Sequence, residues 1–457
     1  MHQIDFENGS ITSNLFQAAL PMLVAQILTL LYSIIDRVYI GRLPGSEGQA
    51  ALAGIGLCFP FIIMVTAFTN LYGSGGSPLC AMARGQHDDE KASHVMNTAY
   101  SMLIVTAVIL TVGGEVFARP LLMLFGASSE NLPFAMAYLR IYLVGTPFAM
   151  LATGLVPYIN AQGFSDMGMA VVTVGAVLNI LLDPLFIFGF HMGVGGAALA
   201  TILSQTVSAL LALRFLYSKK AVLTLRLYPL SRLMRSLDQI RDITALGLAS
   251  FIMQFTNALV NISCNHVLSV FGGSVYITTM TIISSVRQII DTPIMAITEG
   301  ASPILSYNYG ARRPGRIRQT IRMFTIAGLT YTILMWLLIN RFPSWFIHIF
   351  SSDPALHEVA IPAVRTYFAA FIFQALQYSG QSVFKSLGKK RHAIFFSLLR
   401  KVVLVVPLTF LFPYLMHMGT HGVFLAEPVS NFIGGLACFT TMLLTILPEL
   451  RRMEDAK

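Results

Sequence analysis

The chain is dominated by long apolar stretches, each long enough to cross a lipid bilayer as a helix. A spanning helix needs about 20 predominantly apolar residues, and twelve segments of the 457-residue chain meet this requirement. The first six segments are 15–40, 51–83, 95–118, 132–160, 167–190 and 194–217. The second six are 243–270, 275–309, 320–339, 359–384, 393–416 and 422–447.

Only 11% of the residues are charged, and the mean hydropathy is +0.69. Because a soluble domain has about 25% charged residues, we expect an all-α integral membrane protein with twelve transmembrane helices.

The basic residues lie in short clusters between these segments. A formal net charge of +9 could suggest a nucleic-acid partner, but such clusters are typical of cytoplasmic loops in membrane proteins. The even-numbered junctions hold Arg84, Lys91, Lys219, Lys220, Arg226, Arg232, Arg235, Arg241, Arg312, Arg313, Arg316, Arg318, Lys385, Lys389, Lys390 and Arg391. The opposite junctions hold only Arg42, Arg119 and Arg341. We therefore expect both termini on the cytoplasmic side of a cell membrane, a bacterial inner membrane being the expected one, and no nucleic-acid partner.

The two halves of the chain repeat each other at a spacing of 225 residues. Ser77-Pro78 recurs as Ser302-Pro303, and Gly163 recurs as Gly388. Repeats of this kind are typical of secondary transporters, whose halves move around a central site. Six segments per half give both repeats the same topology, so the pseudo-two-fold axis should run along the membrane normal. The expected parts are an N-lobe at 1–217, a cytoplasmic linker at 218–242 and a C-lobe at 243–457.

Two aspartates interrupt the apolar segments of the N-terminal half. Asp36 lies near the end of the first segment, and Asp183 lies in the fifth, four residues after Asn179 and just before Pro184. A carboxylate inside a bilayer costs roughly 2.5–3.5 kcal/mol on insertion scales, so such residues persist where function demands them. Carboxylate and amide oxygens suit a small hard cation, and crowded, desolvated carboxylates also exchange protons near neutral pH. The structural alternative is that Asp36 pairs with Arg37 at the outer membrane surface and Asp183 caps a helix.

The C-terminal half has its own charges inside apolar segments. Arg287 and Asp291 are four residues apart in the eighth segment, and Glu299 lies two helical turns further along. One interpretation is an internal salt bridge that satisfies both charges. The other is that Asp291 or Glu299 faces a cavity and attracts a cationic substrate. Glu427, just before Pro428, is open to the same two interpretations.

A polar stripe runs along one side of the seventh segment. The stripe consists of Gln254, Asn257, Asn261 and Asn265, whose three- and four-residue spacing places them on one face of a helix. The stripe can either line a substrate cavity or form hydrogen bonds between neighbouring helices, and the sequence does not decide between these two.

Several short motifs together resemble the MATE (multidrug and toxic compound extrusion) family. They are Pro21 with Asp36-Arg37-Val38-Tyr39-Ile40-Gly41, Gly75-Gly76-Ser77-Pro78, Ala161-Gln162-Gly163, the Asn179/Asp183-Pro184 pair and the glycine-rich stretch 193–201. The resemblance covers nearly the whole chain, and it implies the MATE fold of two six-helix bundles.

The resemblance also implies roles for particular residues. In related transporters, an aspartate of the first span, an Asn and an Asp of the fifth and a threonine of the sixth form a cation site. The matching positions here are Asp36, Asn179, Asp183 and Thr201. They would be metal ligands only if the coupling ion were Na⁺. Pro21 matches a proline that lets the first helix bend in some members.

The chain departs from one branch of the family. NorM-type members carry carboxylates on spans seven and ten, whereas the matching positions here are Gln254 and the neighbourhood of Leu376. Coupling should therefore depend on the N-lobe. This departure favours a DinF-type or MepA-like branch.

We therefore expect a secondary antiporter that exports organic, mostly cationic amphipathic compounds in exchange for H⁺ or Na⁺. It should need no cofactor, act as a monomer in the lipid bilayer and catalyse no reaction. No GxxxxGK[ST] motif is present, so an ion gradient is the expected energy source. The nearest alternative is a flippase for lipid-linked saccharides, which would need a conspicuously basic cavity. A membrane-bound acyl- or glycosyltransferase is a more distant alternative, since the chain lacks HxxxxD-like and DxD motifs.

Overall fold

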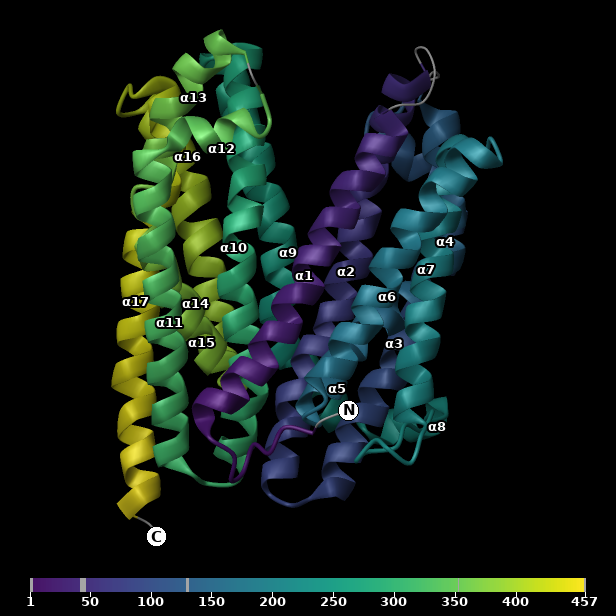
Figure 1. Cartoon of the computed structure of the whole chain (residues 1–457), viewed down its shortest axis with the longest axis vertical. Helices are drawn as coiled ribbons and strands as arrows, with labels where there is room; N and C mark the ends of the chain where they lie inside the picture. Colours follow the sequence, from purple (N-terminus) through teal and green to yellow (C-terminus); the bar gives the residue numbers. More distant parts are fainter. Residues whose placement is uncertain (1–2, 42–46, 129–130, 352, 456–457) are drawn as a thin grey trace. The chain divides into compact units, whose positions relative to one another are not determined.

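The computed structural model describes residues 3–41, 47–128, 131–351 and 353–455, and the described residues form helices but no β-strand. Contacts within the chain define two compact units (Figure 1). Unit 1 comprises Met1–Asp5 and Pro21–Phe251, and unit 2 comprises Phe6–Leu20 and Ile252–Lys457.

The helices follow one another along the chain with short connections. From α1 to α8 they are α1 (Ile11–Gly41), α2 (Glu47–Gly85), α3 (Asp89–Leu124), α4 (Leu132–Gly154), α5 (Val156–Ala161), α6 (Ser165–Pro184), the π-helical η1 (Leu185–Gly189), α7 (Gly193–Leu216) and α8 (Leu230–Arg235). The others are α9 (Leu237–Phe271), α10 (Gly273–Gly310), α11 (Pro314–Arg341), α12 (Pro343–His348), α13 (Pro354–Tyr367), α14 (Phe371–Ser386), α15 (Lys390–Leu398), the π-helical η2 (Leu399–Val405), α16 (Val406–Tyr414) and α17 (Gly419–Asp455).

Every predicted apolar segment coincides with helical structure, which confirms the all-α fold. Ten helical stretches among the described residues are long and apolar enough to cross a membrane. The pair α13 and α14, bent by 46°, makes an eleventh if it is counted as one span. The remaining predicted segment is α10, a 38-residue helix that is not among these because it carries Arg287, Asp291 and Glu299 among many hydroxyl residues.

In unit 1, α4 lies at the centre of the helix packing. It packs against α2, α3 and α7, and α7 also packs against α6. Leu103, Leu139 and Tyr158 are fully buried in the core between these helices. Three of the four candidate cation-site residues lie on α6 and α7, which pack against each other, and the fourth, Asp36, lies on α1.

In unit 2, α14 has the corresponding central position. It packs against α10, α11 and α17, while α17 also packs against α16. Phe368, Phe371 and Phe424 are almost fully buried in the core of this unit. The helices bring residues from α10, η2 and α17 together, although those elements lie far apart in the sequence.

Backbone geometry confirms the internal repeat at particular positions. Gly163 has φ of +90° and its counterpart Gly388 has φ of +71°. His87 and Arg312, also 225 residues apart, have φ of 58° and 51°. Residues with a side chain seldom adopt a positive φ, so the recurrence of this conformation at the same spacing shows that the turns of the two halves are equivalent. The shared motif thus preserves turn geometry as well as composition.

The glycine-rich motif near the end of α2 permits a close helix contact. Gly75 lies so near Ile243 and Gly247 of α9 that an added Cβ at Gly75 would collide with the backbone of α9. Gly247 in turn faces the carbonyl of Leu71. Small residues at such crossings allow membrane helices to approach closely, which explains why a motif of this composition occurs here.

The predicted linker begins with a non-helical strap, residues 218–229, held against unit 1. The backbone N–H groups of Leu223, Arg226 and Tyr228 donate to the side chains of Gln162 (2.9 Å), Asn97 (2.7 Å) and Ser101 (2.9 Å), respectively. Ala221, Leu223 and Leu225 are buried in alternation with exposed neighbours. The strap is followed by the short helix α8, and α9 begins at Leu237, inside the predicted linker range of 218–242.

Candidate functional site

Three of the four predicted cation-site residues meet between α6 and α7 in unit 1. The Asn179 amide nitrogen donates to Asp183 Oδ1 at 3.3 Å and to Thr201 Oγ1 at 3.3 Å. Thr201 donates to the carbonyl of Ala197 at 3.0 Å, so its hydroxyl oxygen is held toward the amide. The sequence spacing predicted that Asn179 and Asp183 share a helix face, and the structure places them one turn apart.

Two oxygens of this group are buried and lack a hydrogen-bond donor among the described residues. They are Asn179 Oδ1 and Asp183 Oδ2. Asn179 is 3% exposed and Asp183 is fully buried. Buried polar atoms in native proteins are nearly always satisfied, so two adjacent unsatisfied acceptors indicate a place where a proton or a cation can bind.

Asp36 of α1 lies close enough to Asp183 for their carboxyl groups to interact electrostatically. It also interacts electrostatically with Tyr32 and Tyr138. The Asp36 side chain is partly buried, so the two carboxylates of unit 1 belong to one neighbourhood. The side chain of Arg37, its alternative partner in the sequence, lies outside the described residues.

Local backbone structure positions Asp183. α6 ends at Pro184, and the five-residue π-helical segment η1 follows at once. Proline lacks an N–H donor and disturbs regular helix bonding, and π-helical turns are frequent at functional sites. Pro21, the predicted bend position, lies inside the continuous helix α1. It is also the first residue of that helix that belongs to unit 1.

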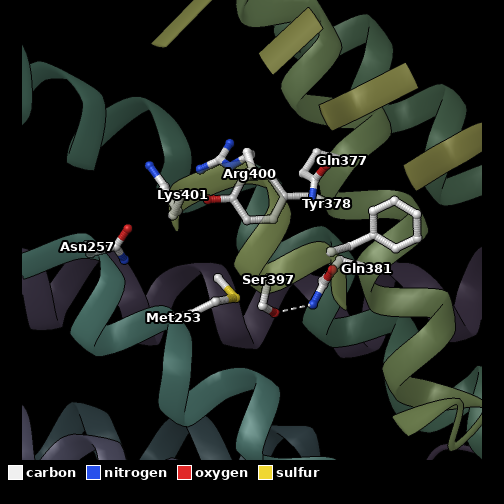
Figure 2. Close-up of a pocket in the computed structure, with 9 residues that line it drawn as sticks. Met253, Asn257, Gln377, Tyr378, Gln381, Ser397, Arg400 and Lys401 are labelled. Carbon is white, nitrogen blue, oxygen red and sulfur yellow. Dashed lines mark hydrogen bonds between the residues drawn. The ribbon is translucent and has the colours of Figure 1, made fainter. Parts of the chain in front are cut away.

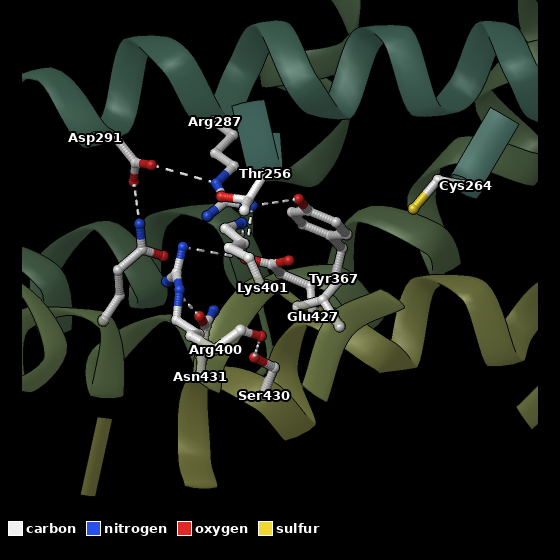
Figure 3. Close-up of polar contacts among 12 residues, drawn as sticks. Thr256, Cys264, Arg287, Asp291, Tyr367, Arg400, Lys401, Glu427, Ser430 and Asn431 are labelled. Carbon is white, nitrogen blue, oxygen red and sulfur yellow. Dashed lines mark hydrogen bonds and ion pairs between the residues drawn. The ribbon is translucent and has the colours of Figure 1, made fainter. Parts of the chain in front are cut away.

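The C-terminal charges form an internal network in unit 2 (Figure 3). Arg287 binds Asp291 at 3.2 Å and Glu427 at 2.6 Å, as the salt-bridge interpretation predicted. Asp291 also accepts from the amide of Gln374 at 2.7 Å. Any contact of Asp291 with a substrate stays a prediction. Glu299 is half-buried further along α10, within electrostatic range of Lys385.

The sequence reasoning missed two members of this network, Arg400 and Lys401. Both lie on η2 and are almost completely buried. Lys401 Nζ donates to Glu427 Oε1 at 3.2 Å, and Arg400 Nη1 donates to Asn431 Oδ1 at 2.9 Å. The cost argument that singled out Asp36 applies equally to two adjacent cations inside segment 393–416, so the signal was present in the sequence.

Arg400 and Lys401 also line a pocket in unit 2 (Figure 2). The pocket is narrow, with room for only a few water-sized groups. Its wall is completed by Met253, Asn257, Gln377, Tyr378, Gln381, Phe396 and Ser397. Of the five residues predicted for a substrate cavity, Asn257 belongs to this wall, whereas Gln254, Asn261, Asp291 and Glu299 do not. The role of these residues in substrate binding stays a prediction.

Comparison with known families identifies the chain. The family model MatE matches residues 21–185 and 246–411, and its two matches begin at the 225-residue spacing of the internal repeat. The chain belongs to the MatE family. The match covers both halves, and it makes this a multi-pass membrane protein.

Several curated relatives of this MatE protein are named transporters. The multidrug export protein MepA of Staphylococcus haemolyticus (strain JCSC1435) is 25% identical over 433 residues, which cover 94% of this chain and 93% of the relative. The MepA protein of Staphylococcus aureus (strain MRSA252) is 23% identical over 441 residues, 96% of this chain and 95% of the relative. These relatives agree with the predicted MepA-like branch. The FAD transporter of Shewanella oneidensis (strain MR-1) is 25% identical over 434 residues, 93% of each chain.

Solved structures confirm the predicted MATE fold. A multidrug resistance MATE family transporter in an outward-facing conformation gives a TM-score of 0.88 at 22% identity, over 97% of each chain. A MATE protein in a bent conformation also gives a TM-score of 0.88, at 20% identity over 98% of this chain and 97% of that chain.

Proposed function

We propose that this MatE protein is a secondary antiporter, in which H⁺ or Na⁺ enters as organic, mostly cationic amphipathic molecules leave the cell. The observation that carries the proposal is the pair of buried acceptors Asn179 Oδ1 and Asp183 Oδ2. They lie in the same neighbourhood as the second carboxylate, Asp36. Such a group is costly in a membrane protein unless it binds a positive charge.

The coupling follows from two requirements on this site. On the outer side, a cation binds at Asp36 and Asp183 and neutralises their mutual repulsion. This binding favours the return of the protein to its inward-facing state. On the inner side, release of the cation restores the negative charge and favours the state that accepts a new substrate. Cation and substrate must prefer different states or compete, because a ligand with equal affinity for both states shifts no equilibrium.

The donor set is compatible with either coupling ion. The oxygens of Asp36, Asn179, Asp183 and Thr201 are hard ligands of the kind that Na⁺ prefers, and a proton would need only the carboxylates. Thr201 therefore distinguishes Na⁺ coupling from H⁺ coupling, because its hydroxyl oxygen has a role as a ligand for Na⁺ and none as a proton acceptor.

The relatives support export of drug-like molecules, since the MepA proteins are named multidrug export proteins. The alternative function, a flippase for lipid-linked saccharides, would need a basic cavity that holds a pyrophosphate. Arg400 and Lys401 supply positive charge in one pocket of unit 2. A flippase, however, gives no role to the acidic group on α1 and α6. We therefore prefer the exporter, with both termini in the cytoplasm and the protein in the cell membrane.

The test uses inside-out vesicles with ethidium as cargo and an imposed pH or Na⁺ gradient. We expect Asp36→Asn and Asp183→Asn each to lower gradient-driven uptake by at least about tenfold, because each removes a charge of the ion site. Asp166→Asn is the matched control, since Asp166 is an exposed carboxylate in the first turn of the same helix α6. It should transport like the wild-type protein.

Wild-type uptake, measured separately under a pH gradient and under a Na⁺ gradient, would identify the coupling ion. If Asp36→Asn and Asp183→Asn both kept full gradient-driven uptake, the ion site proposed here would be wrong.

A further inference from the structure

The buried charge network of unit 2 contains more cations than carboxylates. Its charged members are Arg287, Asp291, Arg400, Lys401 and Glu427. All five side chains are 15% exposed or less. In the ion pairs found among the described residues, these five side chains are paired only with one another. With all five ionised, the network therefore has one excess positive charge.

Glu427 cannot balance the cations around it. Its Oε1 is shared by Arg287 at 2.6 Å, Lys401 at 3.2 Å and Arg400 at 3.8 Å. Asp291 accounts for one further cation, since it pairs with Arg287. An unbalanced buried charge is costly unless a counter-charge reaches it. Either Lys401 gives up its proton, or an anion approaches the network from outside.

The position of the excess charge favours the anion. Arg400 and Lys401 are the two members of the network that line the pocket, and the network's carboxylates do not line it (Figure 2). Arginine offers a planar fork that matches carboxylate and phosphate oxygens, and lysine adds a compact charge. A negative group in the pocket would therefore meet two cations and no carboxylate of the network.

The rest of the pocket wall suits the apolar body of an organic molecule. Met253, Tyr378 and Phe396 line it beside the two cations. The pocket itself has room for only a few water-sized groups, which is about the size of a carboxylate or phosphate group. The apolar part of a larger molecule would therefore have to lie at the mouth of the pocket, beside these side chains.

In the internal repeat, the equivalent helix of unit 1 lacks these cations. α15 begins at Lys390 and α6 begins at Ser165, which is the 225-residue spacing of the repeat. At the same spacing, Arg400 and Lys401 correspond to Gly175 and Ala176 of α6. The equivalent helix is therefore neutral at these positions. In unit 2 the two cations lie on a π-helical segment, a local distortion that is frequent at functional sites.

We propose that the pocket formed by α9, α14, α15 and η2 binds an oxyanion, a carboxylate or phosphate group, carried by an amphipathic organic molecule. The proposal rests on the proposed export function, because it specifies the chemistry of a substrate. It extends the expected substrate class from cations alone to molecules that also carry a negative group.

Two probes that differ only in a carboxylate test the proposal. Rhodamine B has a cationic ring system and a free carboxylate, and rhodamine B ethyl ester has the same ring with the carboxylate blocked. Binding is measured by fluorescence polarisation on the full chain in phosphatidylcholine nanodiscs, without any ion gradient. We expect wild-type protein to bind rhodamine B about tenfold more tightly than the ester, the typical effect of one charge-assisted hydrogen bond.

Variants of Lys401 then test whether this side chain causes the preference for rhodamine B over its ester. Lys401→Met leaves two cations and two carboxylates in the network, so it should fold and lose the preference for rhodamine B over the ester. Lys401→Arg keeps the charge and should keep the preference within about threefold. Lys219→Met removes one exposed lysine of the linker and should bind both probes like wild type.

Sodium phosphate distinguishes a free ion from a group on a substrate. If phosphate alone binds to wild type and not to Lys401→Met, while both rhodamines bind equally, the site takes a free anion and the substrate part of the proposal is wrong. If neither phosphate nor the carboxylate gives a Lys401-dependent difference, the anion site itself is disproved. Binding is measured at equilibrium, so these results do not depend on whether gradient-driven transport occurs.

Discussion

At the scale of single residues, Glu427 is the shared acceptor of the buried charges in unit 2. Its Oε1 pairs with Arg287, Lys401 and Arg400. Arg287 lies 140 positions from Glu427 in the sequence, so no local spacing predicts their contact.

Loss of the shared carboxylate should be severe. Glu427→Gln leaves three buried cations with one carboxylate, and breaking a buried ion pair on one side costs about 3–5 kcal/mol. We expect a clear drop in the thermal unfolding midpoint of the purified protein in detergent, measured by circular dichroism.

Glu454→Gln is the matched control for this stability effect. Glu454 pairs with Arg318 at 2.8 Å, but its side chain is 42% exposed. Exposed pairs contribute about 0–1 kcal/mol, so the midpoint should hardly move. Equal midpoints for the two variants would show that the buried network does not stabilise the fold.

At the scale of elements, apolar length predicted the helices but not where each helix begins or breaks. The segment predicted at 95–118 is a helix from Asp89, because Asp88 caps it by accepting the N–H of Lys91. The break between α13 and α14 falls within a segment that is apolar on both sides, so hydropathy gave no sign of it. The π-helical segments were unpredictable for the same reason.

The strap that joins the halves depends on side chains of unit 1. Asn97→Ala removes the acceptor of the Arg226 N–H, and Gln162→Ala removes the acceptor of the Leu223 N–H. We expect the double variant to be cut by trypsin in the strap at least about fivefold faster, since local opening exposes the basic residues there.

Gln86→Ala serves as the control for the proteolysis, because Gln86 is an exposed amide in the turn between α2 and α3. It should be cut at the wild-type rate. An unchanged rate in the double variant would mean that the buried apolar residues of the strap hold it without these hydrogen bonds.

The bend predicted at Pro21 has a test at the same scale. Pro21→Ala restores a backbone N–H inside α1 and removes the steric cause of a kink. If bending of α1 accompanies transport, ethidium transport should fall several-fold while expression and thermal stability stay at the wild-type level. Pro147→Ala, in the interior of α4, is the control for a proline elsewhere in the unit. Wild-type transport by Pro21→Ala would remove the bend from the mechanism.

At the scale of the whole molecule, the distribution of basic residues predicts orientation. His191 and Lys219 are exposed residues just outside the two ends of α7, a helix of 24 residues. Such a helix is about 36 Å long, enough to cross a bilayer. We expect His191→Cys to react with a membrane-impermeant maleimide on intact cells and Lys219→Cys to react only after the membrane is opened.

The native background suits this labelling, since Cys58, Cys80, Cys264 and Cys438 are all buried. Labelling of both variants from outside, or the reverse order, would contradict the expected cytoplasmic termini.

The duplication explains why the overall fold was predictable and the differences between the halves were less so. Turn glycines recur at a fixed spacing, and Gly163 and Gly388 each lie two residues past the end of a helix. The charges do not follow this repeat: α6 carries Asn179 and Asp183, while its counterpart carries Arg400 and Lys401 one to two turns earlier. Each pair acquires its partners only through contacts between distant segments.

If the protein is a cation antiporter, inward movement of H⁺ or Na⁺ must accompany export of the organic substrate. The most direct measurement uses purified protein in proteoliposomes with a fluorescent pH or Na⁺ indicator inside and no ion gradient at the start. An imposed ethidium gradient should then drive the coupled cation in the opposite direction, and this flux should disappear in Asp183→Asn. Ethidium movement by the wild-type protein with no opposing flux of either H⁺ or Na⁺ would show that the protein is not a cation antiporter.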